Sequence, residues 1–395
     1  MNVNRFASTA KLTRLIVALV FAGLATDPSA AQIQNRVCDT IPYDYIHNRI
    51  VIPVVLNGIP VRYIVDTGGQ TGTVAEVAVK AGAEAQGYAG VSDLNSNKSV
   101  FQKGVISNVA LSPHHTLAQL SSLILPENGF FDELGVVGIL GCDAFAGTVV
   151  TIDERNKILV INIPYRPERL KVGDGLPLLS TNSLHPIVEV PFGNTTVEVL
   201  FDTGVPDFLL LSMQDAERLT TAQAAHKESE AFGIVGAGIH GLGDPVKIAR
   251  LTVPELTVGS QRFTGASGTT TVMDNSIIGA SLLHHGKVVI DFLRRRFYFL
   301  PYSQEPVDMA DEPGHWNVDI LPLDGAFRIT TVWESLGGQA AFGDKVVEIN
   351  GTRLDGVPMD EWSIRRIMAD IPTDTATLII EKEGKERRII ITKEK

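Results

Sequence analysis

Two aspartates, Asp66 and Asp202, each begin the same triplet, Asp-Thr-Gly. A carboxyl group donates a proton when protonated and accepts one when ionised. Two carboxyl groups about 3 Å apart cannot both ionise, so they share one proton. Such a pair can take a proton from water and polarise a carbonyl group at the same time. This chemistry needs no metal ion and no covalent nucleophile, but both aspartates must lie in one symmetric site.

The sequence around the two triplets is repeated. Each triplet follows an alternating apolar pattern with a turn of Gly and Asn, which predicts a β-hairpin whose second strand runs into the aspartate. An apolar-apolar-Gly pattern comes later in each copy, so that Gly141 follows Asp66 by 75 residues and Gly279 follows Asp202 by 77. This matched spacing predicts an internal duplication that supplies both halves of a symmetric site.

Between the triplets and the later apolar-apolar-Gly patterns, the sequence predicts mostly short strands and turns, with helical stretches near 74–83 and 213–225. The periodicity lapses at 164–177 and at 301–313, where Pro, Gly and charged residues gather. We therefore predict a mainly β protein with these segments: signal peptide 1–31, first lobe 32–170, second lobe 171–303, linker 304–317 and C-terminal domain 318–395.

Composition excludes some classes of function. Apolar residues make up 44% of the 395-residue chain, which is enough for folded domains with proper cores. Asp plus Glu outnumber Lys plus Arg by 45 to 34, and a net charge of -11 disfavours binding to a phosphate backbone. We expect a soluble monomer that does not bind nucleic acid.

The N-terminus has the features of a secretory signal peptide. Arg5, Lys11 and Arg14 precede an apolar run over 15–25, and small residues then lead to a cleavage site after Ala31. The apolar run is too short to span a bilayer, which needs roughly 20 apolar residues. We expect an exported protein, periplasmic or extracellular, with no membrane contact after cleavage.

The cysteines and paired histidines are further candidates for chemistry. Cys38 and Cys142 could form a disulfide in an oxidising compartment, or Cys142 could be a small buried residue and Cys38 a free thiol. The sequence leaves both open, with a slight preference for the second. The pairs His114-His115 and His284-His285 have no third ligand at a recognisable spacing, so we expect no metal ion.

The combination of apolar-apolar-Asp-Thr-Gly with a later apolar-apolar-Gly resembles the pepsin and retropepsin superfamily, in its bacterial single-chain form, over about residues 48–165 and 184–300. The resemblance implies two β-barrel lobes related by pseudo-two-fold symmetry, and a catalytic dyad of Asp66 and Asp202 that hydrolyses peptide bonds. It implies that six further residues support the dyad: Thr67, Gly68, Thr203, Gly204, Gly141 and Gly279. Two alternatives stay open: triplets that merely cap hairpins, and a catalytically silent peptide-binding protein that keeps the fold.

Two segments are candidates for a flap over bound peptide. One contains Gly236 and Gly238 in the second lobe, and the other contains Tyr88 in the first. Gly236, Gly238 and Gly241 also match the spacing of a dinucleotide-binding loop, but that loop must open a helix, whereas a proline and a strand pattern follow here. We therefore expect no cofactor.

The C-terminal domain contains Gly-Asp-x-Val-x-x-Ile-Asn-Gly at 343–351, followed by a helical stretch over 360–369 and a hairpin. This pattern resembles PDZ domains, which bind extended chains by adding a strand to a sheet edge. The resemblance implies a second polypeptide partner, with Gly325, Ala326 and Phe327 as candidate peptide-binding residues. Their turn departs from the usual Gly-hydrophobic-Gly-hydrophobic pattern. The alternative is a domain that only packs on the lobes.

Overall fold

The structure is a computed structural model, and it describes residues 36–92, 98–127, 129–180, 183–238, 241–310, 314–382 and 384–394. The predicted signal peptide lies outside the described residues. In the described ranges strands dominate, as predicted, and the α-helices are short: α1 (Ala75–Lys80), α2 (Gly129–Leu134), α3 (Met213–Thr221) and α4 (Glu361–Ala369). None of these helices is long and apolar enough to cross a membrane.

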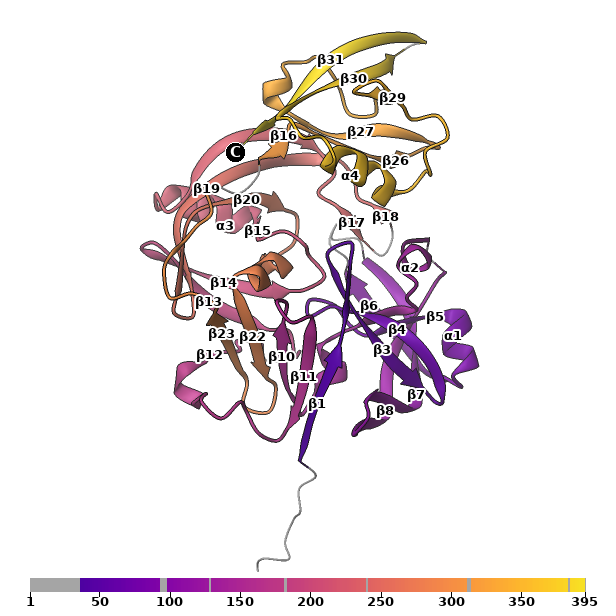
Figure 1. Cartoon of the computed structure of the whole chain (residues 1–395), viewed down its shortest axis with the longest axis vertical. Helices are drawn as coiled ribbons and strands as arrows, with labels where there is room; N and C mark the ends of the chain where they lie inside the picture. The colour runs from indigo at the N-terminus through magenta and orange to yellow at the C-terminus, as the bar shows by residue number, and fades with distance from the viewer. Residues whose placement is uncertain are drawn as a thin grey trace, which may run out of the picture. The chain divides into compact units, whose positions relative to one another are not determined.

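Three large sheets hold most of the strands (Figure 1). The eight-stranded sheet has the order β2 (Asp44–Ile46), β3 (Arg49–Leu56), β4 (Ile59–Val65), β9 (Gly138–Leu140), β5 (Gly72–Val74), β8 (His115–Leu125), β7 (Lys98–Ser112), β6 (Glu84–Ser92). The six-stranded sheet has the order β1 (Val37–Pro42), β11 (Ile158–Ile163), β10 (Val149–Asp153), β22 (Gly286–Asp291), β23 (Arg296–Pro301), β12 (Leu176–Pro177).

The largest sheet has 15 strands and continues from the second half of the repeat into the C-terminal domain. Its order is β24 (Val307–Asp308), β20 (Gln261–Thr271), β15 (Leu209–Ser212), β21 (Ser276–Gly279), β14 (Thr195–Asp202), β13 (Ile187–Phe192), β19 (Val246–Val258), β16 (His226–Gly233), β27 (Ala326–Trp333), β28 (Lys345–Ile349), β30 (Thr375–Lys382), β31 (Lys385–Glu394), β25 (His315–Trp316). β26 (Val318–Leu323) pairs with β27, and β29 (Thr352–Arg353) pairs with β28. A small separate ribbon joins β17 (Ala237–Gly238) to β18 (Gly241–Leu242).

The predicted hairpins before the two triplets are confirmed. β3 pairs antiparallel with β4, and β13 pairs antiparallel with β14. In the first hairpin Asn57 and Gly58 have φ of 46° and 86°, which is the left-handed conformation that a two-residue turn needs to match the twist of its strands.

The predicted helices form but are shorter than expected. α3 begins where the Ser212 side chain accepts a hydrogen bond from the backbone N–H of Asp215, and it ends at Thr221. α2 was not predicted. It forms because Phe131 and Leu134 bury their side chains in a core of the first half.

The two halves of the repeat share a core. β10 and β22 pair antiparallel at the centre of the six-stranded sheet, with Ile152 opposite Val288. One hydrophobic cluster runs from Ile41 to Met309, and in it the rings of Phe201 and Phe297 lie 5.4 Å apart. A separate cluster, from Val318 to Ile391, forms the core of the C-terminal domain.

Parts of the predicted linker, 304–317, pair with strands on either side of it. Val307 in β24 pairs with Phe263, and Met309 is only 8% exposed. β25, at the other end of the segment, pairs with β31. Met309 and Val307 pack on the core of the second lobe, which the proline-rich composition of the segment did not indicate.

The second lobe and the C-terminal domain are joined by strand pairing as well as by the chain. Phe232 of β16 lies opposite Val332 of β27, and the backbone N–H of Ile234 donates to the carbonyl of Thr330 at 2.9 Å. A Cβ placed on Gly233 would lie 2.4 Å from the Thr330 carbonyl oxygen. The two strands therefore approach too closely for any side chain at this position.

We predict that Gly233→Ala will weaken this junction, because the added methyl group must push β27 away. The expected loss is about 1–3 kcal/mol in the free energy of unfolding. Gly236→Ala is the matched control, since a Cβ at that position meets no atom within 4 Å. Urea denaturation of both variants measures the effect, and equal stabilities would contradict the tight pairing.

Candidate active site

Matching strand pairings bring the two triplets to the same place. Asp66 follows β4, which runs parallel to β9 with Val65 opposite Leu140. Asp202 ends β14, which runs parallel to β21 with Gly279 as its partner. β5 and β15 flank β9 and β21 on the other side, in antiparallel pairing. Each aspartate therefore emerges between the same set of neighbouring strands.

The two threonines of the triplets bond to each other's backbone. Thr67 N–H donates to Thr203 Oγ1 at 3.1 Å, and Thr203 N–H donates to Thr67 Oγ1 at 3.0 Å. Each hydroxyl then donates to the opposite half, Thr67 Oγ1 to the Phe201 carbonyl and Thr203 Oγ1 to the Val65 carbonyl, both at 2.7 Å. Thr67 and Thr203 are 3% and 0% exposed, so water does not compete for these bonds.

The glycines of the triplets allow the close approach. A Cβ on Gly68 would lie 2.2 Å from Asp202 Oδ2, and a Cβ on Gly204 would lie 2.7 Å from Asp66 Oδ2. Each glycine N–H also donates to the aspartate of its own triplet, at 3.0 Å for Asp66 and 2.7 Å for Asp202. Each carboxyl group is thus held by its own triplet and faces the other one.

Gly141 and Gly279 lie against the backbone of the loops that follow the triplets. A Cβ on Gly141 would lie 2.5 Å from the Gly69 carbonyl oxygen, and one on Gly279 would lie 2.2 Å from the Asp207 carbonyl oxygen. These contacts explain why apolar-apolar-Gly recurs at matched distances, because no other residue fits there.

The two carboxyl groups differ in burial. Asp202 is 6% exposed and is hydrogen-bonded to the side chain of Asp66, which is more open to solvent. Burial, and then the neighbouring charge of Asp66, raise the pKa of Asp202 well above its usual range. The pair is therefore arranged to hold a shared proton at a pH where isolated aspartates would both be ionised.

The first hydroxyl side chains after the two triplets bond to other carboxyl groups. Thr71 Oγ1 donates to Asp143 Oδ1 at 2.8 Å. Ser212 Oγ donates to Asp215 Oδ2 at 2.9 Å. The residues directly after the triplets are Gly69 and Val205, which have no side-chain donor.

The cysteines do not form a disulfide in the structure. Cys38 is exposed and Cys142 is buried, and both are free. The thiol of Cys142 donates to the Thr67 carbonyl at 3.3 Å, directly beneath the first triplet. The interpretation of Cys142 as a small buried residue is therefore confirmed.

The predicted flap residues lie on β6 and near the β17–β18 ribbon. Tyr88 is 74% exposed on β6, the last strand of its sheet, and Gly238 pairs with Gly241 in the β17–β18 ribbon. Their role in a flap, with that of Gly236, stays a prediction.

The predicted peptide-binding residues of the C-terminal domain lie at the turn between β26 and β27. Asp324 and Gly325, with φ of 50° and 70°, form the tight turn between β26 and β27, and Ala326 begins β27. Phe327 is 2% exposed and its side chain belongs to the domain core, so its part in peptide binding stays a prediction, as do those of Gly325 and Ala326. Alternation along β27 directs this side chain inward.

Sequence analysis missed Arg49, the first residue of β3. Its charge acts on both aspartates of the triplets, and theirs act on it. The signal that could have found it is the hairpin register, because Arg49 lies at the end of β3 that adjoins Asp66.

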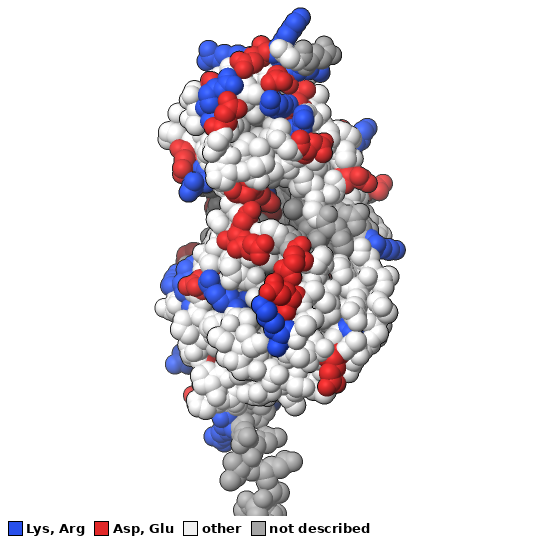
Figure 2. All heavy atoms as spheres, turned by 90° about the vertical axis from the view of Figure 1, so that its right-hand side faces the viewer, with Lys and Arg blue, Asp and Glu red and all other residues white. Residues whose placement is uncertain are grey.

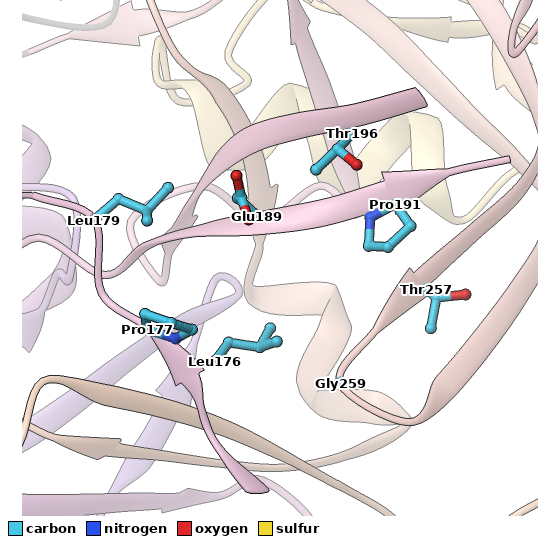
Figure 3. A pocket seen from close by; sticks show the side chains of 8 residues that line it. All are labelled: Leu176, Pro177, Leu179, Glu189, Pro191, Thr196, Thr257 and Gly259. Atoms are coloured by element: carbon cyan, nitrogen blue, oxygen red, sulfur yellow. The ribbon is translucent and has the colours of Figure 1, made fainter. Parts of the chain in front are cut away.

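A cavity of about 250 Å³ lies elsewhere, on the second lobe (Figure 3). It is lined by Leu176, Pro177, Leu179, Glu189, Pro191, Thr196, Thr257 and Gly259. No predicted site residue is among them. Across the described ranges, no group of three or more His, Cys, Asp or Glu residues could hold a metal ion.

No protein family model matches the chain, and no curated protein matches it. Among solved structures, an aspartic proteinase from Irpex lacteus is similar over 68% of this chain and 98% of its own, with a TM-score of 0.42 and 15% identity. Basic 7S globulin from soybean is similar over 70% of this chain and 98% of its own, with a TM-score of 0.39 and 14% identity. Neither likeness is strong enough to assign a role to any residue of this chain.

We predict that Thr67→Val and Thr203→Val will each destabilise the protein. Loss of either hydroxyl leaves a buried N–H and a buried carbonyl without partners, at about 1–3 kcal/mol for each group. Thr67→Ser, the control, keeps the hydroxyl and loses one methyl group, for about 1 kcal/mol. Chemical denaturation measures the differences. If the Val and Ser variants at position 67 were equally stable, the cross-bonding would not matter energetically.

Proposed function

We propose that this chain is an aspartic endopeptidase of the two-lobed, pepsin-like kind, with Asp66 and Asp202 as its catalytic pair. The observation that carries the proposal is the reciprocal bonding of Thr67 and Thr203, which holds two Asp-Thr-Gly turns face to face. A triplet that merely caps a hairpin has no need of a partner triplet. The raised pKa of Asp202 supports the same conclusion, because it favours a proton shared with Asp66.

The proposed reaction uses both protonation states of the pair. The ionised carboxylate takes a proton from a water molecule, and the water oxygen bonds to the carbonyl carbon of the peptide. The protonated carboxyl group gives its proton to the carbonyl oxygen, which yields a neutral tetrahedral intermediate. The carboxyl group that gained the water proton then protonates the leaving nitrogen. The C–N bond breaks, the second proton returns from the intermediate to the other carboxylate, and the pair is restored to its starting state.

We further propose that the chain acts as an exported monomer on polypeptides, and that its C-terminal domain binds or gates them. In support, β26 pairs with β27 along one edge and α4 packs beside it. A strand edge next to a helix is a geometry in which an extended chain can be added to a sheet.

We predict that Asp66→Asn and Asp202→Asn will each lower kcat by a factor of about 10²–10⁴, the contribution of a positioned acid or base. The side chains have the same shape, so folding should persist, and circular dichroism checks it. Cleavage of a mixed peptide library, analysed by mass spectrometry with and without pepstatin, measures activity. A folded wild-type protein that binds peptides and cleaves none would instead indicate the catalytically silent alternative.

The pH dependence follows from the raised pKa of Asp202. The pair is active with one proton bound, and activity is lost when that proton dissociates as the pH rises through the raised pKa. Because neither Gly69 nor Val205 offers a hydroxyl to stabilise the charged form, we predict a bell-shaped profile centred at about pH 5–7. An optimum below about pH 4 would contradict this account.

Gly69→Ser tests the missing donor directly. A Cβ at this position would lie 3.0 Å from the Asp66 Oδ2 atom, so a serine hydroxyl can reach the carboxyl group. A donated hydrogen bond stabilises the ionised form and lowers its pKa, so the acidic limb should move to lower pH. Gly69→Ala adds the same Cβ without a donor, and its acidic limb should stay in place. Equal shifts in both variants would assign the effect to crowding.

A further inference from the structure

Arg49 is brought to the candidate active site by the hairpin that carries Asp66. Val51 of β3 lies opposite Ile64 of β4, and continuing this antiparallel register by two positions places Arg49 opposite Asp66. Residues directly opposite each other in such a pair project their side chains from the same face of the sheet. The turn before Arg49, formed by His47 and Asn48 with φ of 47° and 58°, starts β3 at this residue.

The guanidinium group of Arg49 is partly buried but weakly bonded. Its Nη1 atom donates to the carbonyls of His47 and Asn48, each at 3.4 Å, the long limit for a hydrogen bond. Over the described ranges, no carboxylate lies within 4.0 Å of it. Burial lowers the pKa of Arg49, yet a guanidinium stays charged at any pH where the protein is folded. A half-buried cation with no carboxylate in direct contact therefore lies within electrostatic reach of the two aspartates.

The nearby acidic residues do not neutralise Arg49 by direct contact. Glu361, on α4 of the C-terminal domain, bonds to Arg365 at 2.7 Å. Asp207 is exposed and acts on Arg49 only through its charge. Asp66 and Asp202 are held by the N–H groups of their own triplets. Within the described ranges only Nη1 of Arg49 donates hydrogen bonds, so Nε and Nη2 remain available, and two such parallel donors match the two oxygens of a carboxylate.

We propose that Arg49 is a specificity-determining residue that selects polypeptides with an acidic side chain next to the scissile bond. This inference rests on the proposed peptidase function and names its substrate class. The selection must come from direct contact, because the long-range field works against it. The chain has a net charge of -11, and acidic side chains gather across the middle of the face in Figure 2.

A role confined to tuning the aspartates makes a different prediction. If Arg49 only altered the proton affinity of the pair, its removal would shift the pH profile equally for every substrate. If it binds a substrate carboxylate, its removal changes the ratio of rates for Glu and Gln peptides that are otherwise identical. This ratio for the wild type should also rise with pH near about 4.3, where a glutamate side chain ionises.

The experiment starts with library cleavage by the wild-type protein, followed by synthesis of matched Glu and Gln peptides at each position flanking the preferred bond. We expect kcat/KM to favour Glu over Gln by about 10-fold or more at one position, as for a hydrogen bond to a charged group. Arg49→Gln should abolish the ratio, Arg49→Lys should keep part of it, and Arg49→Glu should reverse it towards a Lys peptide. Arg62→Gln is the matched control, because Arg62 lies on the adjacent strand in an ion pair with Asp44. Its ratio should equal that of the wild type.

A binding measurement separates failure of this inference from failure of the proposed function. Calorimetry on the Asp66→Asn, Asp202→Asn double variant should show tighter binding of the Glu peptide than of the Gln peptide. If the wild-type protein cleaves nothing, the matched peptides are chosen from the library by binding to it, and a Glu preference that Arg49→Gln abolishes would overturn the peptidase function and keep Arg49 as the selecting residue. Equal Glu and Gln values in both cleavage and binding, or a ratio unchanged in Arg49→Gln, would overturn the inference.

Discussion

The hydrogen bonds exchanged by Thr67 and Thr203 hold the candidate site together. Each hydroxyl accepts from one N–H and donates to one carbonyl of the opposite half, so four backbone groups are satisfied by two side chains. Because these groups are buried, leaving any of them unpaired is unfavourable, and the halves have one arrangement in which all are paired. The contact of each glycine with the opposite aspartate follows from that arrangement. The sharing of one proton between Asp66 and Asp202 also depends on that arrangement.

The environment of Asp202 lowers the stability of the folded protein at neutral pH. A carboxyl group whose pKa is higher in the folded state than in the unfolded chain binds more proton when folded, so its contribution to stability falls as the pH rises between the two values. Asp202 is in this position because of its burial and the charge of Asp66. The rest of the fold must offset the loss, and the continuous core shared by the two halves is the available source. Functional sites commonly contain an unfavourable local arrangement that the rest of the structure stabilises.

Sequence reasoning succeeded where a local pattern determines geometry. The Asn57-Gly58 turn was predicted because its residues favour positive φ. The strands leading to the triplets, and the later glycines, were predicted because the same pattern occurs around both triplets. It gave no information where tertiary packing decides. The turn pattern around Gly325 did not indicate that strand alternation buries the Phe327 side chain. Met309 lay in a segment with a linker's composition, but it packs on the second lobe. Arg49 escaped notice because its position beside Asp66 depends on register across a hairpin and carries no motif.

The six-stranded sheet has a consequence for how the chain reaches its folded state. More than a hundred residues separate β10 from its partner β22 in the sequence. The partner of β1, the first described strand, is β11, which also lies far along the chain. Pairings so distant in sequence slow folding, because a long loop must close before its contacts form. Until β22 arrives, one edge of β10 is an open template for other chains. A first half made without its partner therefore exposes a strand edge that the complete chain covers.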